Sequence, residues 1–260
     1  MSETSPREEQ FTEFELGEFQ LDGFVIVRSL IPESYCNRIL AVTHRDSAAH
    51  FGDIEYEADL NYPGAPTSRD SVGGRTIRRL KQAFSRDPVF SELVKERFLL
   101  NRLKQVLGPQ VVMPLAHHNC IMTKHPRFSS DTGWHQDIRY WSFMRPELIN
   151  AWIALGTETL QNGCLRLLPG THTQPLRRDQ LDDDLFLRED LEENQNWLQT
   201  AVVAELQPGD VLFFHARSFH AATRNYSDET KYSAVFTFRS MDNLPLPETR
   251  SAALPELLLL

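Results

Sequence analysis

The chain has 260 residues, 41% hydrophobic and 24% charged, so it can fill a hydrophobic core, and its length favours one large domain over two small ones. The net charge of −9 is spread along the chain and argues against nucleic acid as the main partner. Three cysteines, Cys36, Cys120 and Cys164, form no zinc-type pair and fit a reducing compartment such as the cytoplasm better than a disulfide framework.

The first 108 residues are predicted to be mainly helical. Apolar residues at helical spacing indicate a helix over 11–21, followed by a strand at 24–27 and a second helix that begins after Pro32. Residues 51–74, rich in Gly, Pro, Asp and Ser, are predicted to form a long surface loop. One long amphipathic helix is expected from the N-cap Asp87 to the C-terminal stop at Gly108.

A basic segment precedes that helix, with four positive side chains at Arg75, Arg78, Arg79 and Lys81. Such a segment can be a solvated charged edge. It can also be a wall that receives an anionic substrate or the carboxylate of a cosubstrate. Both interpretations stay open at this stage.

After Gly108 the sequence changes to short apolar runs separated by turn signals, at 111–113, 119–122, 149–155, 164–168, 201–206, 211–214 and 232–238. Strands without intervening helices predict a sandwich or barrel. We therefore predict a mainly β fold with flanking α-helices, a double-stranded β-helix (jelly roll, cupin-like). The single domain divides into a helical cover with the first strands (1–108), a jelly-roll core (109–240) and a C-terminal tail (241–260).

Two segments have open roles. Residues 176–197 are dominated by charge, which favours a solvated helix or loop over a lid above the site. The terminal run 257–260 is four leucines, too short to cross a bilayer; we expect it to dock on the protein or on another subunit, with a peripheral membrane contact as the alternative. The polar residues 1–10 contain no secretory signal, and oligomeric state is left open.

One triplet carries metal-binding chemistry. In an extended backbone, His135 and Asp137 point to the same face while Gln136 points away, so the two can hold one metal ion together. A second histidine would complete a 2-His-1-carboxylate triad, which binds Fe(II) and leaves positions open for substrate and dioxygen. Two histidines, His215 and His220, follow the predicted strand at 211–214, and either can complete the set.

Several further motifs resemble the phytanoyl-CoA dioxygenase family of Fe(II)- and 2-oxoglutarate-dependent oxygenases. In the family's order and spacing, between residues 115 and 239, they are His135-Gln-Asp137, Tyr140-Trp141, Ala151-Trp152, Asn162-Gly-Cys-Leu165, Leu168-Pro-Gly-Thr-His172, Pro208-Gly-Asp210 and His220-Ala-Ala-Thr-Arg-Asn225. The resemblance implies that His135, Asp137 and His220 bind the iron. It also disfavours halogenation, because halogenating relatives lack the acidic ligand that is Asp137 here.

The resemblance also implies a cosubstrate site, from which this chain departs at two positions. The arginine that holds the far carboxylate of 2-oxoglutarate in the family corresponds to Lys231, which lacks the bidentate guanidinium; Arg239 and Arg224 are possible substitutes. Ala222 replaces a small hydroxyl residue. By the same resemblance, Trp152, His118 and Cys120 line the cosubstrate pocket, with Gln136 as a further candidate and Lys124 as a weaker one.

The expected activity is hydroxylation of an unactivated C–H bond, with 2-oxoglutarate and dioxygen converted into succinate and carbon dioxide. The candidate substrate contacts, Arg79, Arg139, Tyr140 and Trp141, suggest a small or lipid-linked anionic substrate, for which an acidic lipopolysaccharide sugar, an acyl-CoA thioester and a natural-product scaffold are candidates. The alternatives are a cupin-like metalloenzyme that does not use 2-oxoglutarate and a non-catalytic binding protein.

Overall fold

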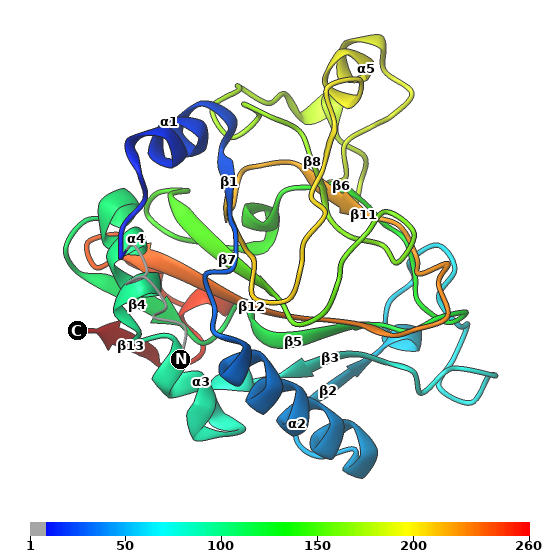
Figure 1. The fold of residues 1–260 in the computed structure, drawn as a ribbon. Helices are drawn as coiled ribbons and strands as arrows, with labels where there is room; N and C mark the ends of the chain where they lie inside the picture. Colours follow the sequence, from blue (N-terminus) through cyan, green and yellow to red (C-terminus); the bar gives the residue numbers. More distant parts are fainter. Residues whose placement is uncertain (1–8) are drawn as a thin grey trace.

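The computed structural model describes residues 9–260. It contains two β-sheets, and most of its α-helices lie on one side of the larger sheet (Figure 1). The α-helices are α1 (Glu13–Asp22), α2 (Glu33–Ala49), α3 (Pro88–Leu93), α4 (Arg97–Leu107) and α5 (Glu192–Leu198). The predicted jelly-roll architecture of antiparallel sheets is confirmed. The absence of a secretory signal, predicted from residues 1–10, falls largely on residues outside those described.

The larger sheet holds nine strands. Seven follow one another in the order β1 (Phe24–Val27), β10 (Val211–His215), β7 (Leu148–Ala154), β12 (Lys231–Ser240), β5 (Asn119–Lys124), β3 (Ile77–Lys81) and β2 (Ile54–Tyr56). In addition, β4 (Val111–Pro114) pairs with β12, and β13 (Glu256–Leu259) pairs with β4. Neighbouring strands are antiparallel throughout, so residues far apart in the sequence are placed opposite one another.

The smaller sheet holds four strands in the order β6 (Thr132–His135), β11 (His220–Ala222), β8 (Arg166–Leu167) and β9 (Val202–Val203). The pairing of β6 with β11 sets His135 directly opposite His220. The sheet order therefore brings together two histidines that are 85 positions apart in the sequence (220 minus 135).

The larger sheet separates two hydrophobic clusters because successive side chains of a strand point to opposite faces. On its outer face, alternate residues such as Ile153 and Phe236 pack against the helices, among them Ile39 of α2 and Phe90 of α3. On its inner face, residues such as Trp152, Val235 and Phe214 pack against Leu167 of the smaller sheet and against Leu165, which precedes that strand. The polar residues of the inner face lie between the two sheets and form the site described below.

The helix expected over 87–108 is two helices, which corrects the sequence prediction. Asp87 caps α3 by accepting a hydrogen bond from the Val89 amide at 3.1 Å, and Gly108 ends α4 with a φ of 90°. Between them, Glu96 has an extended backbone and its carboxylate accepts a hydrogen bond from the Tyr35 hydroxyl of α2. The helix is thus interrupted at residue 96, and both short helices contribute apolar side chains to the cluster on the outer face of the sheet.

Residues 51–74 are only partly the surface loop that their composition predicts. Residues 54–56 form strand β2, which pairs with β3, and Glu57 is fully buried. Its carboxylate accepts hydrogen bonds from Arg78 at 3.2 Å and from Ser130 at 2.7 Å. A long-range ion pair of this kind leaves no periodic signal in the sequence, which explains the missed strand.

The C-terminal tail docks on the protein, which was expected, and is not only a free end that could contact a membrane. Strand β13 extends the larger sheet through β4, and Leu259 is buried there while Leu258 stays exposed. Because the backbone of 256–259 is committed to the sheet, this run is a poor candidate for a membrane contact. No helix within residues 9–260 combines the length and the apolar content needed to span a bilayer.

Candidate metal centre

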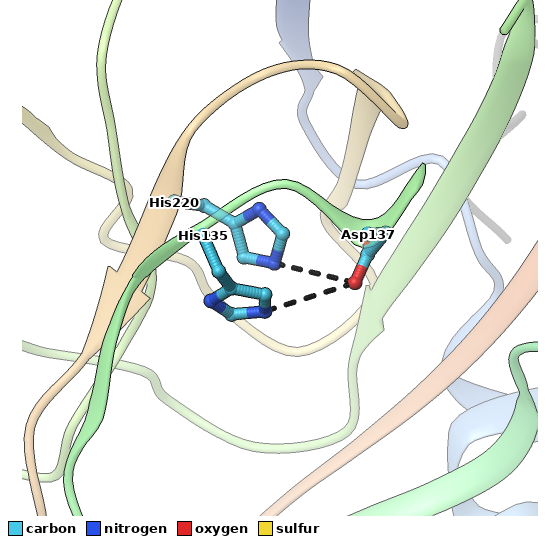
Figure 2. Close-up of side chains that lie close together, drawn as sticks. All are labelled: His135, Asp137 and His220. Atoms are coloured by element: carbon cyan, nitrogen blue, oxygen red, sulfur yellow. Dashed lines mark ion pairs between the residues drawn. The ribbon is translucent and has the colours of Figure 1, made fainter. Parts of the chain in front are cut away.

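Three potential metal ligands converge at the end of the smaller sheet (Figure 2). His135 is the last residue of β6, His220 is the first residue of β11, and Asp137 opens a short 3-10 turn that follows β6. Gln136 between them is extended, with φ −107° and ψ 135°, so the two side chains around it reach the same face as the sequence argument requires. His215 is not part of the set; its Nδ1 accepts a hydrogen bond from the Arg217 amide.

The distances in this cluster fit one metal ion. The Nε2 atoms of His135 and His220 each lie 3.7 Å from Oδ1 of Asp137, and one ligand atom from each residue lies within 4.8 Å of the others. Two imidazole nitrogens and one carboxylate oxygen on the same side of a metal position are the donor set of the facial triad that Fe(II) enzymes use. The residues present therefore fit the metal that the sequence predicts.

Hydrogen bonds orient both imidazoles toward that point. Nδ1 of His135 lies 2.8 Å from the carbonyl oxygen of Gly133, and Nδ1 of His220 lies 3.1 Å from that of Ser218. A carbonyl oxygen can only accept, so each Nδ1 carries the proton and donates it. The lone pair is thereby left on Nε2, the atom that faces Asp137.

Asp137 is held by a buried chain of hydrogen bonds that the sequence did not reveal. The side-chain amide of Asn150 in β7 donates to Oδ2 of Asp137 at 2.8 Å. The hydroxyl of Thr237 in β12 donates to the side-chain oxygen Oδ1 of Asn150 at 2.6 Å. Both residues are fully buried. This chain fixes Oδ2, while Oδ1 faces the Nε2 atoms of His135, His220 and His118. The signal that could have found it is a lone asparagine within the apolar run 149–155.

The protonation states also suit a metal. Burial lowers the pKa of His135 and of His220 and so favours neutral imidazoles. Burial alone would raise the pKa of Asp137, but the imidazoles of His118 and His220 hold it well below its ordinary range. Burial would lower the pKa of His118, yet Asp137, 3.1 Å from its Nε2, raises it to about 9.

The triad lies between two cavities. The inner cavity is lined by all three ligands and, among others, by Arg79, His118, Lys124, Trp152, Ala222 and Lys231. The outer cavity is lined by His135 and Asp137 and, among others, by Arg79, Cys120, Arg139, Tyr140, Trp141 and Arg250. A metal ion at the triad would therefore face both spaces at once.

The charged segment 176–197 reaches over this region through Phe186. The ring of Phe186 lies edge-on to His135, with 5.9 Å between centroids, and the guanidinium of Arg139 lies 4.0 Å from the same ring. Arg139 also donates to the backbone carbonyl oxygens of Asp184 and Leu185 at 3.3 and 3.4 Å. The segment thus covers His135, and its movement as a lid stays a prediction.

The chain was compared with protein families and with known proteins. The family model for phytanoyl-CoA dioxygenase matches residues 19–233. The chain belongs to the phytanoyl-CoA dioxygenase family. Members of this family are Fe(II)- and 2-oxoglutarate-dependent dioxygenases, so the enzyme class predicted from the sequence is confirmed.

The chain is similar to three curated relatives. A probable phytanoyl-CoA dioxygenase of Caenorhabditis elegans is 24% identical over 226 residues, covering 81% of this chain and 69% of the relative. The peroxisomal phytanoyl-CoA dioxygenase of Homo sapiens is 25% identical over 247 residues, covering 86% of this chain and 67% of the relative. A third relative, from Bos taurus, is 30% identical, and the match covers 63% of that relative.

Solved structures share the fold. EctD from S. alaskensis with 2-oxoglutarate and 5-hydroxyectoine has a TM-score of 0.76 at 18% identity, covering 98% of this chain and 85% of that one. The epimerase SnoN in complex with Fe3+, alpha ketoglutarate and nogalamycin RO has a TM-score of 0.71 at 18% identity, covering 90% and 86%. At this identity the likeness shows the fold, and the site rests on this chain's own residues.

Three residues proposed for the cosubstrate site of this family member lie elsewhere, and we correct them. The guanidinium of Arg239 is bound by Glu256 of β13, and Arg239 lines neither cavity. Arg224 pairs with Asp131 at 2.6 Å. Gln136 donates to the backbone carbonyl of Arg217 at 2.5 Å and points away from the metal position. Side-chain parity along a strand placed Arg239 on the correct face but did not reveal its acidic partner.

The other proposed residues line the two cavities, although Cys120, expected in the cosubstrate pocket, lines the outer cavity. Lys231, Trp152 and His118 line the inner cavity, while Cys120, Arg139, Tyr140 and Trp141 line the outer one. Three members of the basic segment 75–81 reach the cavities: Arg78 lines the inner one, Lys81 lines the outer one, and Arg79, which is paired with Glu55 at 3.2 Å, lines both. Arg78 is also paired with the buried Glu57. Their roles toward cosubstrate and substrate stay predictions.

Proposed function

We propose that this dioxygenase hydroxylates an unactivated C–H bond of a small or lipid-linked anionic substrate, held in the outer cavity while 2-oxoglutarate occupies the inner one. The observation that carries the proposal is the position of the triad, since His135 and Asp137 line both cavities. A reaction that couples two organic molecules at one metal needs this two-sided access.

The chemistry comes from the iron and the cosubstrate. When bound, they activate dioxygen so that one oxygen atom enters succinate, the other enters the substrate, and carbon dioxide leaves 2-oxoglutarate. The protein's part is to position the reactants and to exclude water. His135 and His220 present their Nε2 atoms, the Asn150–Thr237 chain fixes Asp137, and Phe186 covers the side of His135. No general acid or base is required of the chain.

The charge of the outer cavity supports an anionic substrate. Arg139 and Arg250 line it, and among the described residues no carboxylate oxygen lies within 4 Å of either guanidinium. Arg79 and Lys81, also in this lining, are already paired with Glu55 and Asp53 at 3.2 and 3.0 Å. Two guanidinium groups without an acidic partner favour a carboxylate, phosphate or sulfate ligand.

A group of exposed apolar side chains, here called the apolar rim, follows Trp141 along the chain. Met144, Leu244 and Leu246 are exposed, and the Met144 amide donates to the Leu244 carbonyl oxygen at 2.9 Å while the Leu246 amide donates to that of Ser142. This rim adjoins Trp141 of the cavity lining along the chain. Exposed apolar side chains in segments that adjoin the lining of a charged cavity favour an amphipathic substrate, such as an acid that carries a hydrocarbon chain.

Arg250→Gln is expected to raise the KM for an anionic substrate by about 10-fold or more, with a smaller change in kcat, because a hydrogen-bonded charge contact is lost. The measurement is succinate release over a panel of acyl-CoA thioesters, acidic sugars and long-chain acids, each with an uncharged analogue. Arg97→Gln, on the exposed face of α4, is the matched control. Equal turnover of charged and uncharged analogues would argue against the anionic assignment.

The compartment stays a prediction. The described chain contains three buried cysteines, Cys36, Cys120 and Cys164, all as free thiols. We propose that the enzyme acts in a reducing compartment such as the cytoplasm, because thiols persist there.

A further inference from the structure

Two buried lysines face each other across the larger sheet beside the metal centre. Lys124 ends β5 and Lys231 begins β12, and the two are directly paired in the antiparallel ladder. They are only 8% and 6% exposed, and both line the inner cavity together with the triad. Side chains directly opposite on neighbouring strands have Cβ atoms about 5 Å apart, close enough for both ammonium groups to reach one ligand.

Lys231 is part of a buried hydrogen-bonded cluster in which its charge is balanced by Glu158. Its Nζ donates to Oε2 of Glu158 at 2.8 Å and to the Ser233 hydroxyl at 3.3 Å. Glu158, which is fully buried, also accepts from Nε1 of Trp152 at 3.0 Å and from Ser233 at 2.6 Å. Because Glu158 cancels the charge of Lys231, this lysine alone adds a donor to the cavity but no net positive charge.

Lys124 carries a charge without such a partner. Its Nζ donates to the backbone carbonyl oxygens of Thr223 and Ser130, and no carboxylate oxygen of the described residues lies within 4 Å of it. Gly163 makes room for it: a Cβ there would lie 2.9 Å from Cδ of Lys124 and 2.3 Å from the Thr223 carbonyl oxygen. A buried ammonium that lacks a counterion is costly, and a bound anion would remove that cost.

Building on the proposed function, we propose that Lys124 and Lys231 together bind the far carboxylate of 2-oxoglutarate in place of a single arginine. Lys124 supplies the net charge, and Lys231, oriented by Glu158, supplies a second donor. An ammonium group has three hydrogens, and each lysine uses two on the protein. One hydrogen of each remains for the two oxygens of a carboxylate, which resembles the two-point contact of a guanidinium.

The charges around Lys124 make this contact sensitive to pH. Burial and the nearby charges of Lys231 and Arg78 lower the pKa of Lys124 to about 7, against an opposing effect of Glu57 and Asp131. The remaining charged groups that line the inner cavity are Arg79, His118, His135, Asp137 and His220. Without ligand, Lys124 therefore loses its proton as the pH rises through about 7, and the anion must then bind to a smaller protonated fraction.

The test compares two 2-oxo acids that differ only in the far group. 2-Oxoglutarate and 2-oxopentanoate can chelate iron through the same atoms, but the latter ends in a methyl group. Affinities are read anaerobically from the charge-transfer absorption of the Fe(II) chelate, without turnover. Lys124→Met is expected to lower the affinity for 2-oxoglutarate about 10- to 100-fold and to leave the affinity for 2-oxopentanoate within about threefold of wild type. Lys95→Met, exposed between α3 and α4, is the matched control.

Lys124→Arg keeps a permanent charge and guards against a folding defect. In wild type, the preference for 2-oxoglutarate over 2-oxopentanoate should fall as the pH rises from 6 to 8.5; in Lys124→Arg it should stay flat. Titration of the metal ligands affects the binding of both acids equally and therefore cancels in the ratio of the two affinities. The proposal is overturned if Lys124→Met keeps the wild-type preference for 2-oxoglutarate over 2-oxopentanoate, including the case in which both acids bind more weakly by the same factor. If neither acid gives an absorption band with wild type, the proposed function itself fails.

Discussion

Asp137→Ala is expected to lower the Fe(II) affinity more than about 100-fold and to abolish succinate release. Outer hydrogen-bond partners of a metal ligand are typically worth 10- to 100-fold in affinity, and the ligand itself should exceed them. Asp137 is the only anionic ligand of the three, and its pKa is held well below the ordinary range, so it is ionised at neutral pH. Its loss also leaves the Asn150 amide without its acceptor.

The measurement is competition for Fe(II) between the protein and a chromophoric chelator under anaerobic conditions. Asp228→Ala, an exposed aspartate in the turn before β12, is the control and should bind iron as wild type does. Unchanged iron affinity in Asp137→Ala, with the fold intact by circular dichroism, would mean that the metal binds elsewhere in the protein.

Glu158→Ala is expected to destabilise the metal-free protein by about 3–5 kcal/mol, since removal of one partner of a buried ion pair leaves an uncompensated charge. The carboxylate of Glu158 accepts from three side chains, Lys231, Trp152 and Ser233, and all three would lose their acceptor. The loss should appear as a lower midpoint of urea unfolding with a similar slope. A change of this size is a large fraction of the stability of an ordinary domain.

A double variant separates the charge from the packing. Glu158→Ala combined with Lys231→Met removes both charges and should recover part of the lost stability, because no charge is then left unpaired. Glu229→Ala, an exposed change two positions before Lys231, is the control for the local sequence. If the double variant is less stable than Glu158→Ala alone, the cost in the single variant comes from packing and not from the buried charge.

The sequence predicted the metal ligands better than their surroundings. The spacing of His135 and Asp137 follows from the period of an extended chain, and it survives in the structure because Gln136 is extended. The third ligand could not be chosen between His215 and His220 by spacing alone, since only the pairing of β6 with β11 sets His220 opposite His135. The family resemblance supplied that choice.

Residues that act through long-range pairing escaped the sequence argument. Glu158 lies 73 positions from Lys231, and nothing local marks it as the buried partner of a lysine. Arg239 looked suitable because it shares the parity of Lys231 on β12, but Glu256 of the tail binds it. The break between α3 and α4 was also missed; there, Glu96 accepts a hydrogen bond from Tyr35 of another helix, 61 positions away. Local sequence patterns predict helices and strands, but only the tertiary structure shows which charged side chains have an ion-pair partner.

Anaerobic titration of the purified protein with Fe(II) and 2-oxoglutarate tests the central claim most directly. If His135, Asp137 and His220 hold iron beside a cavity that accepts the cosubstrate, a weak visible charge-transfer band should develop and saturate near one equivalent of iron. Tight iron binding without any such band, at saturating 2-oxoglutarate, would contradict the claim and would favour a metalloenzyme that uses no 2-oxo acid.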